Sequence, residues 1–171
     1  SSSEHTQIKK KGNTMYARRL VLIDVENFNG GPVQTPAQAR WCRRMIDNWI
    51  KPEDGDIVVL AADVTTVTNV YAGWPSHRIL PGYGDNGADL QLLEVMEEDL
   101  ATRFTEMVLV SGDRIFAEKV SWLAGQGLPT TVYAHQAGLA KRLAFAATAV
   151  ITTAAPTTST VDSLPIPRKV Q

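Results

Sequence analysis

The sequence has little cysteine, no long apolar run and no excess of charge of either sign, and each shortage excludes a class of protein. Its 171 residues include a single cysteine, Cys42, which rules out an internal disulfide framework or a structural zinc site built from several thiolates. The longest apolar stretches, such as residues 57–62, are far shorter than the ~20 residues that span a membrane, so no membrane segment is expected. The first residues, SSSEHTQIKKKGNT, lack the apolar core of a signal peptide, and together with the single cysteine they favour a cytoplasmic protein.

The near balance of charge conceals an uneven distribution. Lysine and arginine number 17 against 18 acids, for a formal net charge of -1. Residues 1–14 hold three lysines against Glu4, and residues 155–171 hold Arg168 and Lys169 against Asp162, so the central part of the chain is acidic. A broad basic surface for nucleic acid is therefore not expected, and such a partner must be argued from a site or from the two ends.

The chain divides into one structured domain and two polar ends. Residues 1–14 and 155–171 are polar or rich in Thr, Ser and Pro without periodicity, which predicts disordered tails. In residues 15–154, strand-like runs alternate five times with helix-like patterns, which predicts an α/β domain with a parallel sheet covered by helices on both faces. The expected strands are 19–25, 56–62, 77–80, 107–110 and 130–134, the expected helices are 35–49, 64–71, 88–101, 115–125 and 139–144, and a last apolar run covers 149–152.

Acidic and polar side chains follow two of these strands at their carboxyl ends. Asp24, Glu26 and Asn27 come after the apolar run 20–23, and the run 107–110 leads into Ser111-Gly112-Asp113. Because the carboxyl ends of parallel strands meet at one edge of a sheet, Asp24 and Asp113 are expected at the same rim, where open α/β sheets bind ligands. Taken alone, Asp113 is more simply interpreted as the N-cap of the following helix.

A third acid comes from a helix. At 100° per residue, Asp89 lies on the same stripe as Leu93 and Met96, so its carboxylate is expected to point at the sheet. Three converging carboxylates repel one another, and a hard divalent cation such as Mg²⁺ or Mn²⁺ is their ordinary compensation. Such a cation activates water and stabilises charge on phosphate, so the pattern points to phosphodiester hydrolysis.

Three motifs in this order and spacing, LVLIDVENFNGG, GYGDNGADLQLLEVM and MVLVSGDRIFAEKV, resemble the NYN domain family, a branch of the PIN-like ribonucleases. The resemblance covers residues 18–152. It implies a three-layer PIN-like, Rossmann-like fold with a parallel sheet of order 3-2-1-4-5, and metal-dependent endonuclease activity on RNA. Position by position, Asp24 matches the first metal-binding Asp of the family, Asn27 the Asn of its D-x-x-N motif, Asp89 the Asp of its helix motif, and Asp113 the Asp of its S-G-D motif.

The sequence departs from the family pattern at two positions. Ile115 stands where the family often has a further Asp, and Asn86 stands where a Lys often precedes Gly-x-Asp. Glu26 and Asp85 are candidate replacements for the missing acid, with Ser111 as a further accessory residue. Capping of the helix is an equal interpretation for Asp85.

The sequence leaves alternatives to a nuclease. The letters 82–87 spell G-x-G-x-x-G, but a dinucleotide turn is disfavoured because acids surround the point where a pyrophosphate would bind. The main alternative is a non-catalytic NYN module that binds RNA or a protein partner, and a homodimer is also considered. Trp74 and Tyr83 are open to base stacking or local packing, and Asp63 to flanking the site or capping a helix.

Overall fold

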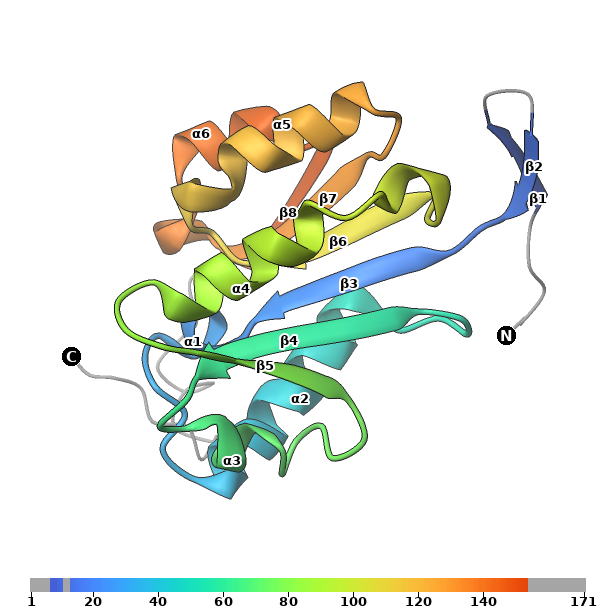
Figure 1. The fold of residues 1–171 in the computed structure, drawn as a ribbon. Coiled ribbons are helices and arrows are strands. Elements are labelled where there is room, and N and C mark those ends of the chain that lie inside the picture. The colour runs from blue at the N-terminus through green and yellow to red at the C-terminus, as the bar shows by residue number, and fades with distance from the viewer. Residues whose placement is uncertain (1–6, 11–12, 154–171) are drawn as a thin grey trace.

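Six parallel strands between two layers of helices make up the body of the molecule (Figure 1). The structure is a computed structural model and describes residues 7–10 and 13–153. No helix within those residues has the length and apolar character needed to cross a membrane. The sheet order is β5-β4-β3-β6-β7-β8, with every neighbouring pair parallel.

The strands are β1 (Gln7–Lys10), β2 (Asn13–Tyr16), β3 (Arg19–Asp24), β4 (Ile57–Asp63), β5 (Arg78–Gly82), β6 (Glu106–Val110), β7 (Thr130–His135) and β8 (Ala149–Thr153). The α-helices are α1 (Val25–Asn29), α2 (Pro36–Ile50), α3 (Val67–Val70), α4 (Gly87–Met96), α5 (Ala117–Gly125) and α6 (Lys141–Ala146). Three short 3₁₀ helices complete the described elements, η1 (Leu100–Thr102), η2 (Arg114–Phe116) and η3 (Gln136–Gly138).

Alternation along the central strands builds two separate cores. Leu20 and Leu22 of β3 pack with α4, α5 and α6, whereas Val21 and Ile23 pack with α1, α2 and α3 on the other face. All four side chains are almost completely buried. A strand that is apolar on both faces is typical of the centre of a parallel sheet, and this position carries the carboxyl end of β3 to the middle of the rim.

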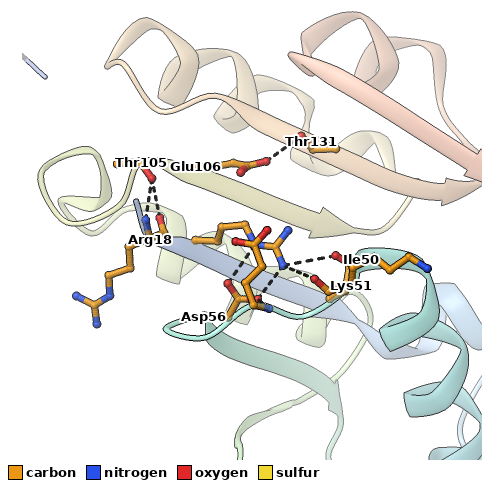
Figure 2. A network of polar contacts seen from close by, with 9 residues as sticks. Arg18, Ile50, Lys51, Asp56, Thr105, Glu106 and Thr131 are labelled. Carbon is orange, nitrogen blue, oxygen red and sulfur yellow. Dashed lines mark hydrogen bonds and ion pairs between the residues drawn. The ribbon is translucent and has the colours of Figure 1, made fainter. Parts of the chain in front are cut away.

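The amino ends of the strands are joined by polar contacts (Figure 2). The Arg19 guanidinium donates to Asp56 through Nε at 3.0 Å and Nη2 at 2.8 Å, and Nη2 also donates to the Lys51 carbonyl at 3.2 Å. These bonds connect β3 to the end of α2 and to the turn before β4. The Arg19 guanidinium therefore compensates acids at this edge, whereas no lysine or arginine lines the acidic site at the carboxyl edge described below.

The predicted sheet order is confirmed for its first five strands and is extended by one. In chain order from β3, the parallel strands run 3-2-1-4-5-6, because β8 pairs with β7 from Thr131↔Ala149 to His135↔Thr153. The apolar run 149–152 is visible in the sequence, but its neighbour in the sheet is a long-range property. The expected three-layer α/β fold is therefore confirmed, with a wider sheet.

Two predictions about segment boundaries are wrong. Residues 1–14 were expected to be disordered, yet β1 and β2 form an antiparallel pair from Gln7↔Tyr16 to Lys10↔Asn13, because backbone hydrogen bonding does not require apolar composition. The helix expected over 88–101 ends at Met96, since three consecutive acids, Glu97 to Asp99, meet the negative end of the helix dipole. Residues 1–6, 11–12 and 154–171, including the C-terminal tail predicted over 155–171, lie outside the described residues.

Candidate functional site

Five acidic side chains line one cavity at the carboxyl edge of the sheet. The cavity has a volume of about 280 Å³. Its acids come from four separate segments and are Asp24, Glu26, Asp63, Asp89 and Asp113. The remaining lining residues are Asn27, Gly84, Asn86, Gly87 and Ala88, so no lysine or arginine contributes to the wall. We refer to this site as the acidic cavity.

Asp24 occupies the centre of the rim as the last residue of β3. Its side chain is 4% exposed and accepts a hydrogen bond from Ser111 Oγ at 3.0 Å. Burial raises the pKa of Asp24 to about 6, although hydrogen bonds from Asp89, Ser111 and the Asn27 backbone favour its charged form. Burial thus penalises the charged form of this carboxyl group, and the hydrogen bonds offset only part of that penalty.

Asp89 projects from the first turn of α4 toward the same point. It is 8% exposed, and its pKa is raised to about 8 by burial, by the charge of Asp24 and by the charge of Asp113. Its carboxyl group hydrogen-bonds with both of these acids. With a pKa of about 8, Asp89 holds a proton at neutral pH, and its single O–H can donate to one of the two neighbouring carboxylates at a time.

A contact between two glycines brings Asp89 into the site. A Cβ on Gly82 would lie 2.2 Å from the Ala88 nitrogen, and a Cβ on Gly87 would lie 2.8 Å from the Gly82 carbonyl carbon. Only glycine permits the end of β5 and the start of α4 to approach this closely. The first and last glycines of the G-x-G-x-x-G letters, Gly82 and Gly87, thus serve helix placement, and Asp89 in the first turn of the helix carries negative charge where a pyrophosphate would bind.

Asp113 lies at the predicted rim and also caps a helix. Its Oδ1 accepts a hydrogen bond from the Ile115 N–H at 3.0 Å, so it caps η2. It also lines the acidic cavity and contributes its charge to Asp24 and Asp89. Capping uses one oxygen, so the second carboxylate oxygen is free to face the other two acids.

Ser111 and Asn27 hold the loops after β3 and β6 together. Ser111 Oγ donates to Asp24 Oδ2 and accepts from the Asp113 N–H at 3.1 Å, so one hydroxyl positions two of the three acids. Asn27 Oδ1 accepts from the Gly112 N–H at 3.0 Å. Both residues predicted as part of the site are therefore present there as positioning groups, and Asn27 also lines the cavity.

Glu26 and Asp63 extend the acidic cavity toward β4. Glu26 Oε2 accepts from the Asp63 N–H at 3.0 Å and from Thr66 Oγ1 at 3.0 Å, so it fixes the turn after β4. Asp63 accepts from the Thr65 hydroxyl and backbone, and these hydrogen bonds lower its pKa. Asp63 flanks the site, but the interpretation of Asp63 as a helix cap is wrong, because Thr66 is the N-cap of α3 and Asp63 holds the turn before it.

Two residues singled out in the sequence lie elsewhere. Asp85 is exposed on the loop before α4, outside the lining of the acidic cavity, and Asn86 rather than Asp85 occupies the N-cap position. Asp85 therefore does not replace the acid missing at Ile115, because the loop directs it away from the rim. Trp74 is buried in the core beneath α2, which confirms local packing, whereas Tyr83 is exposed.

The donor atoms of the cavity match a hard divalent cation. Carboxylate and amide oxygens are the ligands that Mg²⁺ and Mn²⁺ prefer, and Asp24, Asp89 and Asp113 are the side chains that would hold such an ion. Within residues 7–10 and 13–153, no group of three or more His, Cys, Asp or Glu already has the spacing of a metal-ligand set. Instead, Asp89 hydrogen-bonds with Asp24 and with Asp113, and its raised pKa would make ion binding by these three side chains depend on pH.

Comparisons with known proteins support the fold but give no information on the chemistry of the site. No protein-family model matches the chain, and no curated protein matches it. A solved structure of a protein of unknown function from Vibrio parahaemolyticus is similar, with a TM-score of 0.60 and 14% sequence identity over 81% of this chain and 94% of that chain. The protein thus belongs to the class of three-layer, Rossmann-like α/β folds.

Proposed function

We propose that the protein is a metal-dependent endoribonuclease that hydrolyses RNA phosphodiester bonds at the acidic cavity. The observation that supports this most strongly is the convergence of Asp24, Asp89 and Asp113 from three elements on a wall without lysine or arginine. Folding does not require such a cluster, because mutual repulsion and burial both penalise the charged acids. The resemblance of the three motifs to the NYN family supports RNA as the substrate.

The residues of the chain have distinct roles in this proposal. Bound to Asp24, Asp89 and Asp113, Mg²⁺ or Mn²⁺ would supply water activation and stabilise charge on the phosphate. Ser111 keeps Asp24 in one orientation, and Asn27 prevents the loop that carries Asp113 from moving away. Without a cation the carboxylates repel a phosphate, so cleavage is expected to depend strictly on the divalent ion.

Cleavage of labelled single-stranded RNA in Mn²⁺, in Mg²⁺ and in chelator tests the proposal. We expect cleavage only with the divalent ion, and loss of cleavage in Asp24→Asn and Asp113→Asn proteins with unchanged circular dichroism. Asp85→Asn is the matched control because its carboxylate is exposed outside the cavity. Cleavage by the Asp24→Asn protein at the parent rate would show that the activity comes from elsewhere or from a contaminant.

A non-catalytic module that binds RNA or a protein partner is the second candidate. It is favoured by Ile115, which lies where the family often has an acid and packs against the core on the α4–α6 side. RNA binding without cleavage under any divalent ion would select this candidate. Two further points stay predictions: a homodimer or protein partner, and a cytoplasmic location, which the single cysteine favours. Light scattering of the purified protein tests the dimer.

A further inference from the structure

A second hollow in the surface lies beside the acidic cavity and has no role in the proposed catalysis. It has a volume of about 760 Å³ and is formed by η2, α5 and α6. Its wall includes Arg114, Trp122, Arg142 and Phe145. We refer to it as the aromatic groove. Its composition differs from that of the acidic cavity, which contains neither basic nor aromatic side chains.

The aromatic rings of this groove are not explained by packing. Phe145 is 94% exposed and Trp122 is 46% exposed, although large aromatic side chains usually contribute their area to a core. On the same helix as Phe145, Leu143 is fully buried, so α6 already has the side chain that anchors it to the sheet. Exposed rings grouped in one hollow are typical of a surface that contacts a ligand.

The groove also contains unpaired positive charge. Arg114 and Arg142 are exposed, and in the part of the chain that the structure describes neither guanidinium has a hydrogen-bond or ion-pair partner. Glu118 is the acid of the lining. Lys119 lies over the Trp122 ring at 4.7 Å and is paired with Glu97, so it neutralises an acid at the edge of the groove. Two free guanidinium groups beside two rings fit an anionic ligand with flat faces.

The groove and the acidic cavity adjoin along the chain at consecutive lining residues, Asp113 and Arg114. Arg114 follows Asp113, and the Gly112 carbonyl accepts a hydrogen bond from the Ala140 N–H at 2.9 Å, immediately before α6. A Cβ on Gly112 would lie 2.5 Å from the Gly138 carbonyl oxygen, so the two loops touch through backbone alone. This contact holds α6, with Arg142 and Phe145, next to the segment that carries Asp113.

We propose that the aromatic groove binds the single-stranded RNA that extends from the acidic cavity, with bases stacked on Phe145 and Trp122 and phosphates on Arg114 and Arg142. The proposal rests on the proposed function, because RNA is what places a nucleotide strand at the neighbouring cavity. Stacking needs unpaired bases, so a single strand is favoured over a duplex. An apolar protein partner would bury the rings but leave two guanidinium groups without compensation.

Fluorescence anisotropy with a fluorescein-labelled single-stranded RNA of about 12 nucleotides, in chelator, tests this binding separately from the cation. Because stacking of one base contributes ~1 to 3 kcal/mol, we expect Phe145→Ala to weaken binding about fivefold or more, and Phe145→Tyr to retain it. Arg142→Gln is expected to reduce the slope of log affinity against log salt by about 0.7. Tyr71→Ala and Arg44→Gln, exposed positions on the opposite helix layer, are matched controls and should bind like the parent.

Several results would overturn the groove proposal: no binding of the strand by the parent at low salt, parent-like affinity of both Phe145→Ala and Arg142→Gln, or equal competition by a duplex of the same length. A change of monomer–dimer equilibrium in Phe145→Ala without a change in RNA affinity would identify a self-association surface instead. Failure of the nuclease proposal is distinguishable, because a parent that binds RNA through the groove but never cleaves it supports the groove and refutes catalysis.

Discussion

Asp89→Asn tests the electrostatic strain in the acidic cavity without any substrate. The folded protein raises the pKa of Asp89 from 3.8 to about 8, so between these values the native state holds a proton that the unfolded chain has lost. Stability therefore falls as pH rises through this window, and the destabilisation is complete only above about pH 8. Asparagine removes this dependence and keeps an N–H donor toward Asp24 and Asp113.

The size of the effect follows from the shift and from solvent screening. At ~1.4 kcal/mol per pKa unit, the full shift would correspond to roughly 5 to 6 kcal/mol, an upper limit. The carboxyl group borders a cavity open to water, so screening reduces this, and we expect Asp89→Asn to raise the free energy of unfolding by about 1 to 2 kcal/mol at pH 8. At pH 4 the two proteins should be nearly equal.

Urea denaturation followed by circular dichroism in chelator, at several pH values from 4 to 8, measures this difference. Asp85→Asn is the control on the same segment, because that carboxylate is exposed and outside the cavity. The difference between parent and variant isolates Asp89 from other titrating groups. An Asp89→Asn protein that is less stable than the parent at pH 8, or a difference that does not change with pH, would refute the argument that burial and the charges of Asp24 and Asp113 disfavour a charged Asp89.

Three further predictions concern the binding of a divalent cation, the Ser111 hydroxyl and the contact between Gly112 and Gly138. At ~100 times its dissociation constant, Mg²⁺ or Mn²⁺ should stabilise the parent at pH 8 by ~2.7 kcal/mol and the Asp24→Asn protein much less, as thermal melts with and without chelator will show. Ser111→Ala removes the hydrogen bond to Asp24 Oδ2, so the free energy of unfolding should fall by about 1 kcal/mol. The pKa of Asp24 should rise, which shifts the pH profile of cleavage to higher pH. An unchanged profile would contradict a positioning role for Ser111. Gly112→Ala places a Cβ 2.5 Å from the Gly138 oxygen, so it should lower the free energy of unfolding by ~1 to 3 kcal/mol. Gly125→Ala is the control, because nothing lies within 4 Å of its Cβ position. Equal melting temperatures of the two variants would show that the loops separate easily.

The local features from which the site is built follow from the amino-acid sequence alone. The run 20–23 is apolar at every position, and this pattern is sufficient to indicate a central parallel strand. Since parallel strands end at a common rim, the acids that follow two such runs are expected together, and Asp24 and Asp113 do share one cavity. Helical periodicity likewise directs Asp89 inward, because a helix fixes the direction of each side chain relative to its neighbours.

Which further groups meet at that rim depends on tertiary packing. The sequence offers Asp85 as a candidate for the missing acid and favours a helix cap for Asp63, but only Asp63 lines the cavity, since the direction of a loop depends on contacts between distant segments. The exposure of Phe145, the pairing of β8 with β7 and the raised pKa of Asp89 are decided in the same way. Periodicity in the sequence indicates the face of a helix or strand on which a side chain lies. Burial and electrostatic coupling depend on which other elements that face contacts, and these contacts are set by long-range packing.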